Sequence, residues 1–174
     1  ITNMNKNEFK ANEILWKPSK HRIEVSSIFN FIKHVNSNCN LKINNFEALH
    51  KWSVESRSDF WNEVWNFYKI IGEKGKKPYL KPENDLPVTQ FFPFGKLNYA
   101  ENMLKKNDND KAIIFWSEDK IKKQISWHDL RKQVSAAANF FLSNGIKPGD
   151  RIAAFLPNMP ETIIAMLASA SIGA

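Results

Sequence analysis

Arg151-Ile-Ala-Ala-Phe-Leu-Pro-Asn-Met-Pro-Glu-Thr-Ile-Ile-Ala-Met-Leu-Ala-Ser-Ala-Ser-Ile-Gly-Ala174 is the stretch of sequence that decides the fold. Its apolar residues 152–156 predict a buried strand, the prolines that follow predict a turn, and the small apolar residues after Pro160 predict a helix. A helix of this kind packs on a sheet, and one strand does not make a sheet. We therefore expect the chain to be the N-terminal piece of a larger protein.

The residues before that stretch predict a strand, a partner strand and a helix. Residues 112–116 and 121–125 are the expected strands, joined through Glu118-Asp119. Ser126 is expected to cap the helix, which ends at Asn144-Gly145 because glycine readily takes the left-handed conformation of a helix terminus. With the strand at 152–156, this order is a βαβ crossover and predicts an α/β fold with a parallel or mixed sheet. The buried face of the helix is expected to comprise Leu130, Val134, Ala137, Ala138, Phe141 and Leu142.

The first half of the chain predicts helices. Apolar periodicity predicts one over residues 20–35, capped by Ser19, and a second over residues 45–52. A third is expected to begin near Ser56 and to stop at Gly72. Stripes of aromatic residues stack on nucleic-acid bases in some proteins, but they usually form a core, and we interpret this one as core. The stripe comprises Phe60, Trp61, Val64, Trp65, Phe67, Tyr68 and Ile71.

Residues 73–93 form a proline-containing connection between the two halves. Proline removes a backbone donor and clashes with the preceding turn, so this stretch is not a regular helix. We expect an ordered strap along the surface with apolar anchors at Tyr79, Leu80, Phe91, Phe92 and Phe94. Residues 96–105 then predict a short helix with Leu97, Ala100 and Leu104 facing inward.

The composition is typical of a folded domain. The net positive charge does not by itself identify a binding partner. The chain has 174 residues, of which 43% are hydrophobic and 13% aromatic, which is ample for a packed core. Its net charge of +7 is compatible with nucleic-acid binding. The basic residues are scattered among acidic ones, however, so we favour no nucleic-acid partner; an anionic ligand elsewhere in an enzyme suits a basic chain equally well.

Several classes of protein and site are disfavoured by the sequence. Cys39 is the single cysteine, so no disulfide forms within the chain, and the four histidines lack the spacing of a zinc site. No run of about 18 apolar residues predicts a membrane span. The first residues lack the apolar core of a signal peptide. We therefore expect a cytoplasmic protein without a metal site of its own.

No stretch of the sequence carries a catalytic fingerprint. The six glycines are too dispersed for a phosphate-binding loop, and no serine has a nucleophile-elbow context. The carboxylate pairs Asp108/Asp110 and Glu118/Asp119 lie in polar turns, where solvation explains them better than acid–base chemistry. Asn158 follows a predicted strand at the end where α/β proteins gather ligands. A hydrogen bond within its own turn is the simpler interpretation of Asn158.

The second half of the chain resembles the opening of the adenylate-forming acyl-CoA synthetases. The resemblance rests on Ile125-Ser-Trp-His-Asp-Leu-Arg131 and on the stretch from Gly145 to Ala174, where a Gly-x-x-x-Gly-Asp turn precedes a strand, a proline turn and a helix ending in Gly-Ala. Ile152 stands where valine is usual. Leu97-Asn-Tyr-Ala-Glu-Asn-Met-Leu104 resembles the acetyl- and acetoacetyl-CoA synthetase branch. Residues 52–65, with Trp16-Lys-Pro-Ser19, are similar to the extension of acetoacetyl-CoA synthetases.

The resemblance implies a two-domain organisation and a two-step reaction. Residues 1–96 correspond to a helical and irregular N-terminal extension, and residues 97–174 to the start of the AMP-binding (adenylation) domain. In such enzymes ATP and acetoacetate give an acyl-adenylate and pyrophosphate, and coenzyme A then displaces AMP to give acetoacetyl-CoA. Magnesium accompanies the ATP. Catalysis of this kind depends on positioning and on charge stabilisation.

None of the family's functional residues has a counterpart in this chain. The phosphate loop, the nucleotide-binding set and the C-terminal lysine all fall beyond Ala174, so we assign no catalytic, cofactor-binding or metal-binding residue. We expect the chain alone to be inactive, to bind neither ATP nor CoA tightly, and to self-associate through its unfinished sheet. Two alternatives stay open: an acetyl- or propionyl-CoA synthetase, and a non-catalytic interaction module of this architecture.

Overall fold

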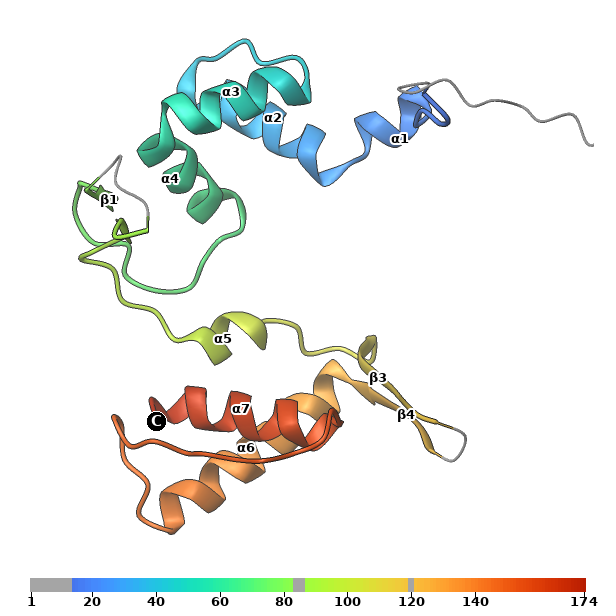
Figure 1. The fold of residues 1–174 in the computed structure, drawn as a ribbon, viewed down its shortest axis with the longest axis vertical. Coiled ribbons are helices and arrows are strands. Elements are labelled where there is room, and N and C mark those ends of the chain that lie inside the picture. Colours follow the sequence, from blue (N-terminus) through green and yellow to red (C-terminus); the bar gives the residue numbers. More distant parts are fainter. Residues whose placement is uncertain (1–13, 83–86, 119–120) are drawn as a thin grey trace, which may run out of the picture. The chain divides into compact units, whose positions relative to one another are not determined.

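A computed structural model describes residues 14–82, 87–118 and 121–174 (Figure 1). The chain divides into two compact units, residues 1–67 and residues 68–174. We call them the helical unit and the C-terminal unit. Each contains its own cluster of buried apolar side chains. No helix in the described ranges is long and apolar enough to cross a bilayer.

From residue 14 onward, the helical unit contains four helices, α1 (Lys20–Glu24), α2 (Ser27–Cys39), α3 (Phe46–Glu55) and α4 (Arg57–Phe67). Ser19 caps α1 as predicted, because its hydroxyl accepts from the Arg22 N–H. The single helix expected over residues 20–35 is wrong. Ser26 has extended backbone angles and its hydroxyl accepts from the Phe29 N–H, so the chain stops and starts a second helix there.

The core of the helical unit lies between α2, α3 and α4. Phe60, Val64 and Phe67 of α4 pack against the buried residues of α2 and α3, which confirms the aromatic stripe as core. Trp61, Tyr68 and Ile71 are exceptions, with 37%, 56% and 40% of their surface exposed. The predicted stop at Gly72 is also wrong, since α4 ends at Phe67. The buried residues are Phe31, Ile32, Val35, Ile43 and Leu49.

The proline-containing connection forms a small antiparallel ribbon in the C-terminal unit. Strand β1 (Leu80–Lys81) pairs with β2 (Gln90–Phe91), and Leu80 is buried. Phe91 and Phe94, expected as anchors, are each nearly half exposed. Residues 83–86 of the expected strap lie outside the described residues. Among its described residues, the connection therefore has one well-buried apolar anchor, Leu80.

The rest of the C-terminal unit is α5 (Tyr99–Met103), β3 (Lys111–Ser117), β4 (Ile121–Ser126), α6 (Trp127–Ser143) and α7 (Pro160–Ile172). β3 and β4 form the predicted antiparallel pair. The Ser126 hydroxyl caps α6 by accepting from the Asp129 N–H at 3.0 Å. Gly145 has φ +85° at the far end of α6, as predicted. Proline at the first turn of α7 is likewise confirmed.

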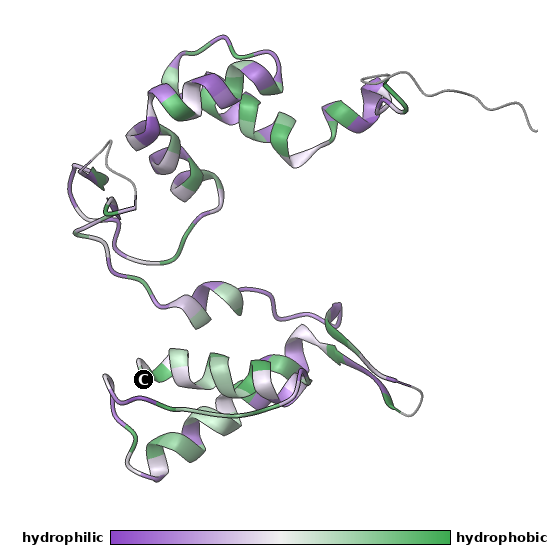
Figure 2. Cartoon of the chain, in the orientation of Figure 1, coloured by the Kyte–Doolittle hydropathy of each residue, from purple (hydrophilic) through white to green (hydrophobic). Residues whose placement is uncertain are grey.

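Helix α7 packs on α6 and α5 to make the second core. Ala100 of α5 and Ala168 of α7 are fully buried, so the small side chains permit close helix contact. Figure 2 shows that α7 is apolar along most of its length. Leu97 and Leu142, both expected to face inward, are instead 53% and 51% exposed. The remaining buried residues are Leu104, Ile125, Leu130, Val134, Ala138, Ile164 and Leu167.

The predicted strand at residues 152–156 is not hydrogen-bonded into a sheet. Figure 1 shows these residues as a straight segment without a strand arrow. In the described parts of the chain the only sheets are the two antiparallel pairs, and neither supplies a neighbour. The expected parallel or mixed sheet is therefore absent from these residues, because a strand requires a hydrogen-bonding partner.

Candidate functional site

The short helix α5 is the centre of a polar junction in the C-terminal unit. The Asn98 side chain caps α5, because its Oδ1 accepts from the Glu101 N–H at 3.1 Å. Its Nδ2 donates to the carbonyls of Ala170 at 2.9 Å and Ser171 at 3.2 Å. These carbonyls belong to the last turn of α7, where no helical N–H follows four residues later, and the Ala170 carbonyl also accepts from the Gly173 N–H at 3.2 Å. One side chain thus joins the start of α5 to the end of α7.

Asn102, one turn after Asn98, fixes the chain that leads into α5. Asn102 Oδ1 accepts from the Ile71 N–H at 2.9 Å, while its Nδ2 donates to the Ile71 carbonyl at 2.8 Å. Lys105 Nζ donates to the carbonyls of Tyr68 at 3.2 Å and Lys69 at 2.8 Å. Asn98 and Asn102 are four residues apart, which is the spacing of neighbours on a helix surface. The Asn-Tyr-Ala-Glu-Asn motif therefore acts here as a structural connector.

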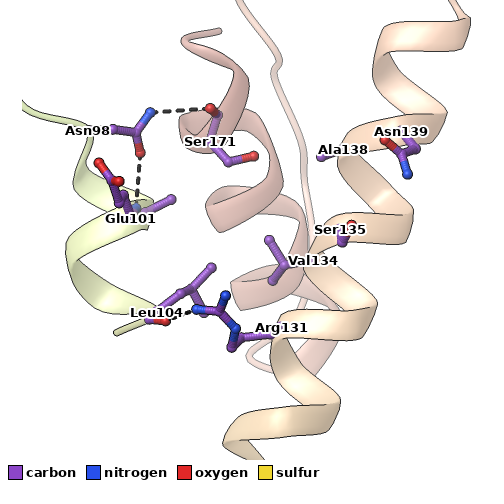
Figure 3. Close-up of a pocket in the computed structure, with 10 residues that line it drawn as sticks. Asn98, Glu101, Leu104, Arg131, Val134, Ser135, Ala138, Asn139 and Ser171 are labelled. Atoms are coloured by element: carbon purple, nitrogen blue, oxygen red, sulfur yellow. Dashed lines mark hydrogen bonds between the residues drawn. The ribbon is translucent and has the colours of Figure 1, made fainter. Parts of the chain in front are cut away.

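A groove of about 560 Å³ lies among α5, α6 and α7 (Figure 3). Arg131 of α6 enters it and donates to the Leu104 carbonyl at the end of α5. The groove offers donors and acceptors above an apolar floor, but its lining has no nucleophile beside a general base. The groove is suited to binding a polar group and not to catalysing a reaction. Its other lining residues are Asn98, Ala100, Glu101, Val134, Ser135, Ala138, Asn139 and Ser171.

Replacing Asn98 separates the two functions of its side chain. Asn98→Ala removes the cap and the two carbonyl contacts, and we expect it to cost about 1–2 kcal/mol of stability. Asn98→Asp keeps an acceptor for the Glu101 N–H but loses the donor to α7 and adds negative charge at a helix C-terminus. Urea unfolding measures both. Full restoration by aspartate would contradict the α7 contact.

Asn158 is the one residue that the sequence analysis considered as a possible ligand-binding residue. It lies at a smaller pocket of about 210 Å³ between β3 and the start of α7. The described residues around it are mostly apolar: Ile113, Ile114, Phe115, Trp116, Met159, Pro160 and Ile163. No second polar side chain from another element converges on Asn158 within this lining. Its assignment to a ligand therefore stays a prediction.

Glu161, three residues further on, has a perturbed carboxyl at the first turn of α7. Its own backbone N–H lowers the pKa of the Glu161 carboxyl, and Lys123 lowers it further from 3.4 Å. Because the folded-state pKa lies below the unfolded value, any stabilisation is present at neutral pH and is lost as pH falls through the folded value. We expect Lys123→Gln to leave the pKa low in an NMR titration. A return to the ordinary glutamate value would show that Lys123 is the main cause.

The carboxylates of Asp108 and Asp110 both lie close to the ammonium group of Lys106. Lys106 Nζ lies 2.8 Å from Asp110 and 3.5 Å from Asp108 at an exposed turn. Its hydrogen bond and charge hold the pKa of the Asp110 carboxyl below its usual range. Asp119 lies outside the described residues, and elsewhere no three His, Cys, Asp or Glu side chains gather to hold a metal ion. The described residues thus do not fit a magnesium site, and no chemical step is assigned to one.

Comparison with known proteins places the C-terminal part of the chain. Residues 100–174 match the family described as "AMP-binding enzyme". The chain is 41% identical over 165 residues to the acetoacetyl-coenzyme A synthetase of Rhizobium meliloti (strain 1021), covering 95% of this chain and 25% of that protein. It is 36% identical over 171 residues to the acetoacetyl-CoA synthetase of Xenopus tropicalis, covering 96% and 25%.

A solved structure agrees with the sequence comparison. The acetoacetyl-CoA synthetase from Streptomyces lividans matches with a TM-score of 0.81 at 30% identity, covering 92% of this chain and 25% of that one. The predicted fold class, a helical extension leading into an adenylate-forming domain, is confirmed by this match. The resemblance to acetoacetyl-CoA synthetases is also confirmed, since the chain is homologous to them over nearly its whole length. It spans about a quarter of the length of these relatives.

Proposed function

We propose that this chain forms the N-terminal part of an ATP-dependent acid–thiol ligase that converts acetoacetate, ATP and CoA to acetoacetyl-CoA, AMP and pyrophosphate. The observation that carries the proposal is the extent of the similarity. It covers 95% of the chain with the Rhizobium meliloti enzyme, whereas the AMP-binding match begins only at residue 100. The residues before Ala100 therefore support the acetoacetyl branch independently of the general adenylation motif.

The contribution of this chain to such an enzyme is structural. We place the start of the adenylation domain at residue 97, in keeping with the match over residues 100–174. Asn98 and Asn102 fix α5 between α7 and the preceding chain. In this proposal ATP, CoA and magnesium bind to parts of the enzyme other than the described residues, among which no three His, Cys, Asp or Glu side chains gather to hold a metal ion. A cytoplasmic location belongs to the same proposal, supported by the single cysteine.

The chain by itself is expected to bind Mg-ATP only weakly. Titration calorimetry of residues 1–174 with Mg-ATP should show no heat of binding at micromolar concentrations, because the chain lacks a glycine-rich loop to surround the phosphates. Binding in that range would show that this chain contains a nucleotide site. It would contradict the proposal that ATP binds to another part of the enzyme.

The proposed activity is tested on the natural gene product. Pyrophosphate release that depends on acetoacetate and CoA, and exceeds release with acetate or propionate at equal concentration, is the expected result. Preference for acetate or propionate would favour the alternative that the protein is part of an acetyl- or propionyl-CoA synthetase. Absence of release with all three acids would favour the non-catalytic interaction module.

A further inference from the structure

The stretch that contains β1 and β2 carries the densest group of lysines in the chain. We call its described part, residues 73–82 and 87–96, the lysine ribbon. Glu73 is the one acidic residue of the ribbon, whereas Glu83 and Asp85 of the same stretch lie outside the described residues. The ribbon therefore has a net positive charge. Its basic residues are Lys74, Lys76, Lys77, Lys81 and Lys96.

The backbone of the lysine ribbon is held in place by hydrogen bonds and close packing. Glu73 and Lys96 exchange two backbone hydrogen bonds of 2.8 Å, and β1 pairs with β2 (Figure 1). Gly75 has φ +76°, and a Cβ there would overlap the Phe94 backbone, so the two sides of the ribbon lie in close contact. The lysines are thus carried by an ordered support. Binding of a partner then orders little more than their side chains.

Aromatic rings hold three of the ammonium groups of the ribbon. Lys74 Nζ lies 5.6 Å and Lys77 Nζ lies 5.8 Å from the centroid of the Tyr79 ring. Lys76 Nζ lies 5.2 Å from the centroid of the Phe94 ring. An ammonium group at such a distance is attracted by the negative face of the ring. Because two ammonium groups share one ring, positive charge is concentrated there, and a nearby anion is attracted by both.

Exposed apolar side chains accompany these lysines. Val88, Phe91 and Phe94 are 59%, 46% and 45% exposed. A groove of about 380 Å³ contains one cationic side chain, Lys81, among mostly apolar walls. Long cationic side chains beside apolar ones are typical of surfaces that lie at the boundary between lipid headgroups and acyl chains. The other residues that line the groove are Pro82, Val88, Gln90, Pro93 and Phe94.

From this combination of charge and exposed apolar surface we propose that the lysine ribbon binds the surface of a bilayer rich in anionic lipids. The lysines attract the headgroups, while Val88 and Phe94 enter the region just below them. Binding of this kind is peripheral and reversible, and it requires no membrane span. The proposal goes beyond the ligase activity, since it concerns the location of the protein and not its reaction.

A bilayer suits these residues better than two other anionic partners. Nucleic-acid bases stack on open aromatic faces, whereas Tyr79 and Phe94 already hold ammonium groups. An acidic polypeptide would match the charge of the lysines but leave the exposed Val88 and Phe91 without an apolar environment. Poly-uridine and poly-glutamate represent these two partners in the test.

The test measures cosedimentation of the purified natural gene product with vesicles of phosphatidylcholine alone, or of equal parts phosphatidylcholine and phosphatidylserine. We expect binding to the anionic vesicles only, and weaker binding as added salt screens the charges. Lys76→Glu/Lys81→Glu should weaken binding on the order of tenfold or more, because each lysine near the surface adds to the attraction. Lys132→Glu/Lys147→Glu makes the same change in net charge at exposed lysines outside the ribbon and should leave binding nearly unchanged.

Val88→Ser tests the apolar part of the contact without a change of charge. We expect it to weaken binding to the anionic vesicles about fivefold, because less apolar surface leaves water. Val54→Ser, at a similarly exposed valine of α3, is the matched control and should bind like the wild type. Circular dichroism of each variant confirms that it is folded, so a loss of binding is attributed to the surface.

Three results would overturn the proposal. One is that the folded protein binds both kinds of vesicle equally, or neither. The second is a loss of binding in Lys76→Glu/Lys81→Glu that is no greater than in its control. The third is binding to poly-uridine or poly-glutamate that equals binding to the anionic vesicles and is unaffected by Val88→Ser. Since no measurement uses acetoacetate, ATP or CoA, failure of the lipid contact and failure of the proposed ligase function are distinguishable.

Discussion

Glu63→Ala is expected to unfold most of the helical unit. Glu63 on α4 is 5% exposed, and its Oε2 accepts from Asn38 at 3.1 Å and lies 2.9 Å from His34 Nε2. Its Oε1 accepts from Asn62 at 2.8 Å and Asn66 at 3.1 Å. Alanine leaves these groups without their shared acceptor, at a cost of about 2–4 kcal/mol. A unit of this size has only a few kcal/mol of stability in total.

Hydrogen exchange of the α2 and α4 amides measures this loss separately from the C-terminal unit, whose α6 amides serve as an internal reference. Glu63→Gln should lie between wild type and alanine, because its NH₂ replaces one acceptor with a donor. Glu55→Ala is the control, since Glu55 forms an exposed pair with Lys51 at 3.8 Å and such pairs contribute about 0–1 kcal/mol. Equal protection in Glu63→Ala and Glu55→Ala would contradict the importance of the network.

Local signals in the sequence predicted two helix starts correctly. Ser19 and Ser126 each cap a helix as expected, because the capping interaction spans only three residues. Asn45, expected as the first residue of a helix, is instead the cap of α3. Proline at the start of α7 and glycine after α6 were predictable for the same reason. Ser26 carried an equally local signal, yet the continuous apolar pattern over residues 20–35 obscured it. At Ser26 the capping signal and the apolar periodicity favoured different structures, and the cap determined where α1 ends and α2 begins.

Long-range contacts were not predictable from the sequence. Glu63 and His34 are 29 residues apart, and their pairing depends on how α4 packs against α2. The strand expected at residues 152–156 failed for the opposite reason, because its sequence is suited to a sheet whose other strands the described residues do not provide. Sequence reasoning therefore identified the conformation that this segment prefers but not its hydrogen bonding.

The sequence identified the residues of the candidate site, Asn98 and Asn102, as part of a motif. It did not predict that they join α5 to α7 and to the preceding chain. Asn98 and Asn102 were quoted in the resemblance, and their spacing of four residues indicates one helix face. What each amide binds depends on the last turn of α7 and on Ile71, which are 72 and 31 residues away. Asn98 has extended backbone angles, and an asparagine just before the first apolar residue of a helix is the one local signal that indicates a cap there.

Leu167→Ala is expected to destabilise the C-terminal unit more than other truncations in α7. Leu167 is 3% exposed and belongs to the buried cluster that joins α7 to α6 and α5. Removing its isobutyl group costs the transfer free energy of the lost carbons plus the cavity left behind, together about 2–5 kcal/mol. The fully buried neighbour Ala168 and the short α5 leave little side-chain volume to refill that cavity.

Met166→Ala is the matched control, because Met166 adjoins Leu167 in sequence but is 48% exposed. We expect Met166→Ala to change the free energy of unfolding by about 0.5 kcal/mol or less in urea denaturation. Similar losses for the two variants would mean that α7 is not held by its buried face.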